Sequence, residues 1–395
     1  MLTPQEKTIQ EFNRIFENDP THYFEIGGRL ELIGNHTDHN RGKCLVAGCS
    51  LGLFASVKKS ADNIVHIVAN GFEEIYLDLD SLNGRAEEFF TSKAIVRGVA
   101  AKLVLSKFKI GGFDAYIEST IFSGAGISSS AAFEVLIARI FDVLYNDGKL
   151  TKMQLAEIAH YSETEYFGKP CGLLDQIGVA FGGVNYLDFE DLANPRVESL
   201  DYKLPINIYL VHTGASHANL THLYSSIKDD MIYVAKRVFD KKDLRAVSKD
   251  DFFKGIAYPT DGVSEQQKLR AQHYIDENDR VDAAREALTK HDAVGFLNAI
   301  RQSGFSSSAF LKNTMAGDYN TSPQRGLDLA NTVLKDGACR IHGGGFAGTI
   351  ICFVKDHEEE PFLRVMTDAF GEDHVVKVGI RESGVTHLCL TTPSK

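Results

Sequence analysis

Cysteine is scarce in this sequence, and its spacing is not that of a disulfide framework. The chain of 395 residues contains six cysteines, and no two of them stand in a CxxC pattern. Small secreted proteins that depend on disulfides contain cysteine at a much higher density. We therefore expect reduced thiols, most of them inside hydrophobic cores, and a reducing compartment.

Long apolar runs are also missing. No stretch approaches the roughly 18 consecutive apolar residues that a transmembrane helix needs. The N-terminal segment "MLTPQEKTIQEFNRIFENDP" places apolar residues at helical spacing among charges, and it lacks the apolar centre of a secretory signal. We therefore expect a cytoplasmic protein with no membrane partner.

Positive charge is the third shortage. Lys and Arg total 42 against 53 Asp and Glu, which gives a formal net charge of -11. Such a charge disfavours nonspecific attraction to nucleic acid and to anionic membranes, although a local basic pocket for an anionic substrate is compatible with it. We expect no nucleic-acid partner.

Apolar periodicity predicts a mixed α+β fold. The length of 395 residues exceeds the size of one ordinary core, so we expect two domains. The first half contains the predicted strands "HYFEIGGRLELI", "LGLFASVKK", "IVHIVA" and "FDAYIEST" and the predicted buried helix "SAAFEVLIARIFDVLY". The second half contains helices near 221–240, 264–288, 292–302 and 323–335, and then the strands "ACRIHG", "GTIICFV" and "HVVKVGI". The polar stretch "EDLANPRVESLDYKLP" lies between them, so we place the N-terminal domain at residues 1–195 and the C-terminal domain at 196–395.

Polar side chains crowd into the segment "GRLELIGNHTDHNRGK" near the N-terminus. If its first five residues form a strand, alternation puts Arg29 and Glu31 on one face and Leu30 and Leu32 on the other. Groups of this kind beside a buried strand need hydrogen-bonding partners, which a polar ligand could supply.

The segment "SGAGISSSAAFEV" is a glycine-rich turn that leads through three serines into an apolar helix. Gly124 and Gly126 would let the backbone approach a phosphate, and the hydroxyls of Ser128, Ser129 and Ser130 could bind that phosphate or Mg²⁺ at the positive end of the helix dipole. A helix N-cap after a flexible turn explains the same residues equally well. The chain has no GxxxxGK[ST] loop.

The glycine-rich segment "CRIHGGGFAGTIICFV" matches GxGxxG as a pattern but not in context. The dinucleotide fingerprint opens a helix, whereas these glycines lead into the strand-like run "TIICFV". A glycine-rich hairpin is one interpretation. The other is a tight loop that lies against a nucleotide or against the first phosphate loop.

Two carboxylates stand out in "SETEYFGKPCGLLDQIGVAFGG". Asp175 is the only ionisable side chain in the ten residues "GLLDQIGVAF", which fits either a buried helix cap or a catalytic group. Glu163 lies on a preceding helical segment, where a solvent-exposed helix face is the simplest interpretation.

In this order the four segments resemble the GHMP kinases, a family of small-metabolite kinases. The family motifs are "GRLELIGNHTDH", "GAGISSSAA" and "HGGGFAGTI". The resemblance extends to "GKPCGLLDQ", "QHYIDENDRV" and "SGFSSSAFL" and so covers most of the chain. The first motif is similar to that of the galactokinase branch, whose usual form is close to GRVNLIGEHTDYN.

The resemblance implies an active site between two domains, ATP with Mg²⁺ as phosphoryl donor, and transfer to the anomeric hydroxyl of galactose, which gives galactose 1-phosphate and ADP. Phosphoryl transfer needs mainly positioning and charge neutralisation. By motif position, Asp175 corresponds to the base that takes the proton from the sugar, and Arg29 to its partner. Ser129 and Glu163 correspond to the Mg²⁺ ligands, whose oxygens suit a hard cation.

The resemblance also implies the sugar contacts. His36 and Asp38 match positions that bind sugar hydroxyls, which must be paired as the sugar leaves water. Tyr224 in "HLYSSI" corresponds to a tyrosine near the sugar, or else it packs its helix against a neighbour.

Two departures from the branch pattern affect this prediction. The family Glu of GEHTDY is Asn35 in this chain and its Tyr is His39, while Glu31 stands where the family usually has Asn. An amide donates as well as accepts, so contact with a sugar hydroxyl, the one on C6, should change. The exchange of residue types between positions 31 and 35 suggests compensation and a working sugar site that uses both residues.

Two other functions compete with galactose phosphorylation. One is a kinase for galacturonate, N-acetylgalactosamine or arabinose, and the other is a non-catalytic sensor of galactose and ATP on the same fold. The retained serines, Glu163, Asp175 and Arg29 weigh against the sensor. Arg29 is the only cation that we place in the cleft, so an acidic sugar should be disfavoured. We expect a monomer.

Overall fold

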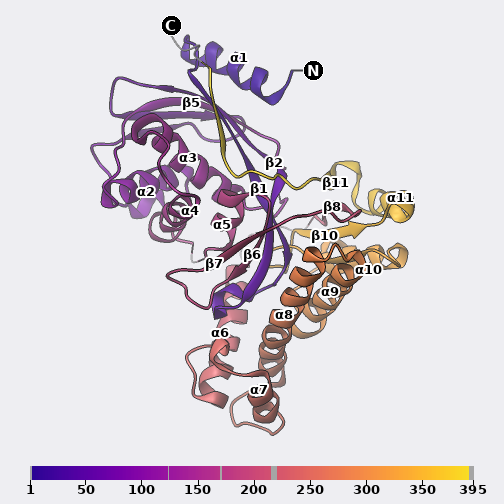
Figure 1. Ribbon diagram of the computed structural model, residues 1–395. Helices are drawn as coiled ribbons and strands as arrows, with labels where there is room; N and C mark the ends of the chain where they lie inside the picture. Colours follow the sequence, from indigo (N-terminus) through magenta and orange to yellow (C-terminus); the bar gives the residue numbers. More distant parts are fainter. Residues whose placement is uncertain (1, 123, 170, 215–219, 391–395) are drawn as a thin grey trace.

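Two β-sheets organise the part of the chain that the computed structural model describes, residues 2–122, 124–169, 171–214 and 220–390 (Figure 1). In the first sheet the strand order is β12-β1-β2-β5-β3-β4, and β6 pairs with both β2 and β7. Its strands are β1 (His22–Ile33), β2 (Lys43–Lys59), β3 (Ile64–Ala69), β4 (Ile75–Asp78), β5 (Phe113–Ser119), β6 (Val184–Asp188), β7 (Arg196–Leu200) and β12 (Thr386–Cys389).

The second sheet is antiparallel, with the order β11-β8-β10-β9. Its strands are β8 (Asn207–His212), β9 (Ala338–Ile341), β10 (Thr349–Val354) and β11 (Val375–Val378). Figure 1 shows this sheet beside the long strands β1 and β2 of the first sheet.

Helices cover both sheets. Those of the first half are α1 (Pro4–Phe16), α2 (Ser92–Leu105), α3 (Ser129–Asn146), α4 (Lys152–Tyr161) and α5 (Leu174–Phe181). Those of the second half are α6 (Thr221–Phe239), α7 (Lys249–Ile256), α8 (Glu265–Thr289), α9 (Ala293–Ser306), α10 (Pro323–Val333) and α11 (Glu359–Phe370). Among the described residues, no helix is both long and apolar enough to cross a membrane.

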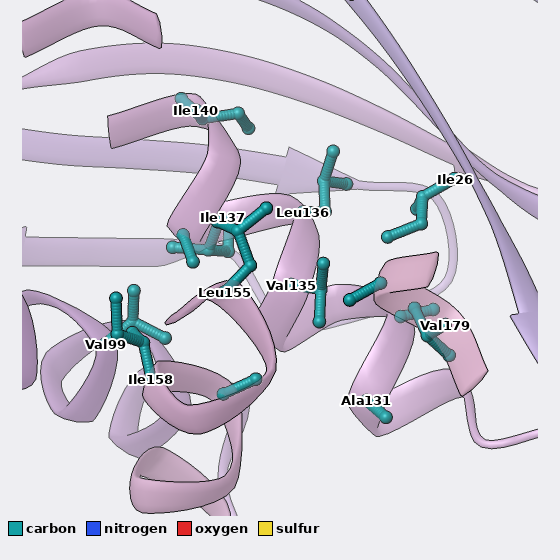
Figure 2. Close-up of a cluster of buried hydrophobic side chains, with 14 of the residues drawn as sticks. Ile26, Val99, Ala131, Val135, Leu136, Ile137, Ile140, Leu155, Ile158 and Val179 are labelled. Atoms are coloured by element: carbon teal, nitrogen blue, oxygen red, sulfur yellow. The ribbon is translucent and has the colours of Figure 1, made fainter. Parts of the chain in front are cut away.

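The helix α3 is the centre of the first core. Figure 2 shows its apolar side chains, among them Val135 and Ile137, packed with Val99 of α2, Leu155 of α4 and Val179 of α5. Burial of each large apolar side chain contributes roughly 1.5–3 kcal/mol. The core therefore fixes the start of α3 and the start of α5 relative to each other.

The strand β2 lies between two cores because its side chains alternate between the faces of the sheet. Cys44 and Val46 belong to the core with α3, whereas Leu45 and Ala47 belong to a second core with α8, α9 and the second sheet. The polar segment at the end of β1 is thus enclosed by both halves of the chain.

Most predicted elements are confirmed, including α3, the strands of the first half, the helices of the second half and the hairpin β9–β10. The polar stretch after β6 differs, because it contains β7, which pairs with β6 in the first sheet. This strand has only two apolar residues, Val197 and Leu200, and the others are charged or polar, so its apolar pattern is weak. The last strand, β12, also returns to the first sheet beside β1. The division at residue 195 stays a prediction.

Candidate active site

Arg29 and Asp175 form an ion pair at the centre of the candidate site. Arg29 lies on β1, and its Nε donates to Oδ1 of Asp175, in the first turn of α5, at 2.7 Å. Ser128 Oγ donates to the other carboxylate oxygen at 2.5 Å. The Asp175 side chain is 24% exposed and the Arg29 side chain 6%. The carboxylate is therefore the part of this pair that a ligand can reach.

Asp175 is ionised at neutral pH. Burial alone would raise the pKa of its carboxyl group, but the positive charges of Arg29 and Lys169 and the hydrogen bond from Ser128 lower that pKa below its usual value. The expected alternative, a helix cap, does not describe this side chain, because it bonds to Arg29 and Ser128 instead of to the start of α5. A partly buried, ionised carboxylate with fixed donors is suited to accept a proton.

Arg29 also joins Asp175 to the glycine–serine segment 124–130, called the phosphate loop below. Its Nη1 donates to Gly126 O at 2.7 Å, and its backbone N–H donates to Ile127 O at 2.9 Å. The predicted base and the predicted phosphate loop are thus held by one side chain.

The phosphate loop ends where α3 begins. Ser128 precedes the helix in a left-handed conformation and makes no side-chain cap, so the N-cap interpretation is not what its hydroxyl does. Ser129 is the first residue of α3, and Ser130 Oγ donates to Glu163 Oε1 at 3.2 Å. The N–H groups of a first helical turn have no intrahelical acceptors and attract anions. Ser123, the first residue of the motif, lies outside the described residues.

Gly124 and Gly126 have positive φ angles of 80° and 69°, which L side chains rarely adopt. A Cβ added to Gly126 would face Nδ1 of His342 at 3.6 Å and Cβ of Thr349 at 3.8 Å, both from the glycine-rich hairpin. The loop is therefore backed by that hairpin.

The hairpin β9–β10, with its turn at residues 342–348, contacts both predicted ligand sites. Thr349 Oγ1 donates to Gly124 O of the phosphate loop at 2.8 Å, and His342 Nε2 accepts from the backbone N–H of Glu31 at 3.0 Å. The predicted hairpin is confirmed, and so is its position against the phosphate loop.

His36 and Asp38 lie in the turn after β1. Burial, with a smaller effect of His39, lowers the pKa of His36 to about 3, so its ring is neutral. Its Nε2 donates to Gly344 O at 2.8 Å, which leaves Nδ1 as an acceptor. Asp38 approaches Gly172 so closely that a Cβ there would lie 2.2 Å from Asp38 Oδ2. The turn thus meets the segment that leads to Asp175.

Asn35 is enclosed by other residues of the protein. It is 1% exposed, and its Nδ2 donates to Glu31 Oε1 at 3.0 Å and to Gly343 O at 2.7 Å. Its Oδ1 accepts from Asn313 Nδ2 at 2.8 Å. Protein atoms therefore use both polar atoms of Asn35, which braces the turn in this arrangement.

Glu31 is paired with a buried arginine that the sequence analysis did not place in the site. Arg340 of β9 donates from Nη2 to Glu31 Oε1 and from Nη1 to Glu31 O, both at 2.9 Å. The Arg340 side chain is fully buried and that of Glu31 is 7% exposed. Glu31 and Asn35 are thus hydrogen-bonded to each other, and Arg340 neutralises the charge of Glu31.

Glu163 is buried, with 1% exposure, so the expected solvent-exposed helix face is wrong. It lies in a π-helical turn, Ser162–Phe167, a form often found at functional sites. Besides Ser130, its carboxylate accepts from Lys169 Nζ at 2.7 Å, Gln176 Nε2 at 2.5 Å and Cys171 Sγ at 3.2 Å.

Lys169 is a second cation in the site, so the expectation that Arg29 is the only one is wrong. Its charge lowers the pKa of Asp175, and Glu163 and Asp175 in turn raise its own pKa despite the opposing effect of burial. The signal was present in the sequence, because Lys169 is the only basic residue in "SETEYFGKPCGLLDQIGVAFGG". Arg340 is likewise the only Lys or Arg in "CRIHGGGFAGTIICFV", but nothing in that segment indicates its partner Glu31.

Tyr224, on α6, bonds to the glycine-rich hairpin. Its hydroxyl donates to Gly345 O at 2.9 Å, and its ring meets Phe346 edge-on with centroids 5.6 Å apart. The residue thus packs its helix against the hairpin, next to Gly344, to which His36 bonds.

Two sequence families match this chain over the segments that build the site. "GHMP kinases N terminal domain" matches residues 94–183, which include the phosphate loop, Glu163 and Asp175. "Galactokinase galactose-binding signature" matches residues 10–59, which include Arg29 and the turn with His36 and Asp38. The predicted resemblance to the GHMP kinases is thus confirmed over these two segments.

Curated relatives are similar to this chain over nearly its whole length. A galactokinase of Streptococcus thermophilus is 27% identical over 371 residues, 92% of this chain and 93% of the relative. A galactokinase of Actinobacillus pleuropneumoniae serotype 5b is 28% identical over 405 residues, 98% of both chains.

Solved structures share the fold. The Lactococcus lactis galactokinase complexed with galactose superimposes with a TM-score of 0.82 at 24% identity, over 96% of this chain and 98% of that one. The Methanococcus jannaschii mevalonate kinase gives a TM-score of 0.65 at 14% identity, over 91% and 98% of the two chains. The predicted α+β GHMP kinase fold is confirmed.

Proposed function

We propose that this chain is a galactokinase, which transfers the γ-phosphoryl group of ATP to the anomeric hydroxyl of galactose. The observation that carries the proposal is the ionised Asp175 carboxylate, held by Arg29 and Ser128 beside the phosphate loop. The galactose-binding signature over residues 10–59 and the full-length similarity to galactokinases support galactose as the acceptor.

In the proposed mechanism Asp175 accepts the proton of the sugar O1 as that oxygen attacks the γ-phosphorus. Arg29 keeps the carboxylate ionised and in place, and it offers positive charge to the transferring group. The phosphate loop binds the phosphates through the N–H groups at the start of α3, between Arg29 and the glycine-rich hairpin. The bond between O1 and phosphorus forms as the bond from phosphorus to ADP breaks.

Magnesium fits the oxygen donors beside this loop. Ser129, at the start of α3, and the Glu163 carboxylate would hold the ion together with phosphate and water oxygens. When bound, Mg²⁺ would neutralise charge on the phosphates. The fit requires one Glu163 oxygen to exchange a protein donor for the ion.

The sugar would lie against the Asp175 carboxylate, beside the turn after β1, where Asp38 packs on Gly172. The neutral His36 ring offers an acceptor and Asp38 a carboxylate, and Tyr224 borders the same space through the hairpin. Glu31 and Asn35 would act on the sugar mainly by fixing this turn. We further propose a cytoplasmic monomer that uses Mg·ATP.

A sugar panel tests the proposal. ADP release is measured with galactose, galacturonate, N-acetylgalactosamine and arabinose at equal concentrations. We expect galactose to give the highest kcat/KM, because Asp38 and Asp175 disfavour the additional carboxylate of galacturonate despite the cations nearby. Higher kcat/KM with galacturonate would assign the chain to a different specificity, and absence of sugar-dependent ADP release would leave the sensor.

A further inference from the structure

The Lys169 ammonium occupies the place beside Glu163 where a metal ion would be expected. Its Nζ lies 2.7 Å from Glu163 Oε1, and the same oxygen accepts from Ser130 in the first turn of α3. The ammonium is therefore next to the helix start that forms the phosphate loop. Asp175 interacts with it electrostatically as well.

The two partners of this ion pair differ in their access to a ligand. The Lys169 side chain is 47% exposed, whereas that of Glu163 is 1% exposed. Glu163 also keeps hydrogen bonds from Ser130, Cys171 and Gln176. The lysine can therefore move away while the carboxylate stays hydrogen-bonded.

The other cations of the site are each bonded both to a carboxylate and to a backbone carbonyl. Arg29 is bonded to Asp175 and to the phosphate loop, and Arg340 is buried against Glu31. A triphosphate that enters the site needs cations, and a lysine on a flexible stem is suited to bind phosphate as a point charge.

We propose that Lys169 exchanges Glu163 for a phosphate oxygen of ATP when the nucleotide binds, and so frees Glu163 Oε1 for a metal ion. This inference rests on the proposed function, because it assumes that ATP occupies the phosphate loop. Lys169 is then a nucleotide-binding residue of this chain, in addition to the residues predicted from the motifs.

Calorimetric titration with ATP in the presence of EDTA tests this role without the metal and without turnover. Lys169→Met should weaken metal-free ATP binding by about tenfold, because one charge-assisted contact is lost. Lys169→Arg should bind within about threefold of the wild type, since the charge is retained. Galactose binding should be unchanged in both variants.

The matched control is Lys149→Met. Lys149 is a paired, exposed lysine at the opposite end of α3, where it bonds to Asp147. The Lys149→Met variant should bind metal-free ATP as the wild type does. If Lys169→Met binds metal-free ATP as the wild type does, Lys169 is only the counter-ion of Glu163 and the inference is wrong.

A reciprocal variant keeps the test decisive if Lys169→Met does not fold. Glu163→Gln releases the ammonium, so metal-free ATP should bind more tightly than to the wild type and more tightly than to Glu165→Gln. Glu165 lies on the same π-helical turn and is exposed, so its variant controls for the loss of one negative charge. Equal binding by the two variants would overturn the inference. Failure of the wild type to bind both ATP and galactose would instead count against the proposed function.

Discussion

The candidate site contains two ion pairs, Arg29 with Asp175 and Lys169 with Glu163, and the exposed partner differs between them. In both, the nitrogen and the oxygen are 2.7 Å apart. The Arg29 side chain is 6% exposed and its partner Asp175 24%, whereas the Lys169 side chain is 47% exposed and its partner Glu163 1%.

The difference assigns a role to each pair. Where the cation is fixed and the carboxylate faces the ligand, the carboxylate can react, and the cation sets its charge. Where the carboxylate is fixed and the cation faces the ligand, the cation can change partners. We infer that the first pair serves proton transfer and the second serves the phosphates.

The largest expected effect comes from the reactive carboxylate of the first pair. Asp175→Asn keeps the side-chain volume but cannot accept the proton, so kcat should fall roughly a hundredfold or more. Steady-state kinetics and ATP titration check this together, because ATP binding should persist. Glu165→Gln, an exposed change nearby, should keep the wild-type kcat, and a near wild-type kcat for Asp175→Asn would remove Asp175 from the mechanism.

The effect of Arg29 on Asp175 should be measurable in the pH dependence of kcat/KM. Arg29 lowers the pKa of Asp175, so the base is ionised and active down to low pH. Arg29→Met should raise that pKa and move the acid limb of kcat/KM to higher pH by about one unit or more. Arg29→Lys keeps the charge and should shift the limb less. An unmoved acid limb in Arg29→Met would contradict the coupling.

A role of Glu163 as a metal ligand should be measurable in the Mg²⁺ concentration that activity requires. Glu163→Gln removes a charged oxygen ligand, so the Mg²⁺ concentration for half-maximal activity should rise about tenfold. Glu165→Gln serves again as the control, and an unchanged Mg²⁺ requirement in Glu163→Gln would exclude Glu163 as a ligand.

The smallest of these effects concerns Asn35 and Glu31, whose hydrogen bonds hold the turn after β1. Asn35→Glu would place two carboxylates beside Arg340 and lose the amide donor, so KM for galactose should rise about fivefold to tenfold. The double variant Glu31→Asn with Asn35→Glu restores one carboxylate and one amide and should recover most of the loss. If Asn35→Glu alone improves galactose use, the compensation is wrong.

The elements that carry the site could be predicted from the sequence because their patterns are strong. Apolar alternation marked β1, with Leu30 and Leu32 in one core, and the long apolar run marked α3. The strand β7 was not predicted, because only Val197 and Leu200 of its five residues are apolar and its stability comes from pairing with β6. The strand β12 depends on pairing with a partner more than 350 residues away.

The site residues divide in the same way. Motif order brought Arg29, Asp175 and the phosphate loop together, and the structure places them in direct contact. The surroundings of Asn35 could not be predicted, because its partners Gly343 and Asn313 come from distant segments. Arg340 was missed for the same reason, since nothing near it in the chain indicates that it pairs with Glu31.

The most direct test of galactose phosphorylation is phosphorus NMR of the product. The wild-type protein is incubated with ATP, Mg²⁺ and galactose, and the Asp175→Asn variant under the same conditions is the control. We predict that the wild type gives ADP together with a phosphate ester whose phosphorus couples to the anomeric proton, and that the control gives neither at a comparable rate. A phosphate on any other sugar carbon, or ADP formation that does not depend on galactose, would contradict the assignment of Asp175 as the base for the anomeric hydroxyl.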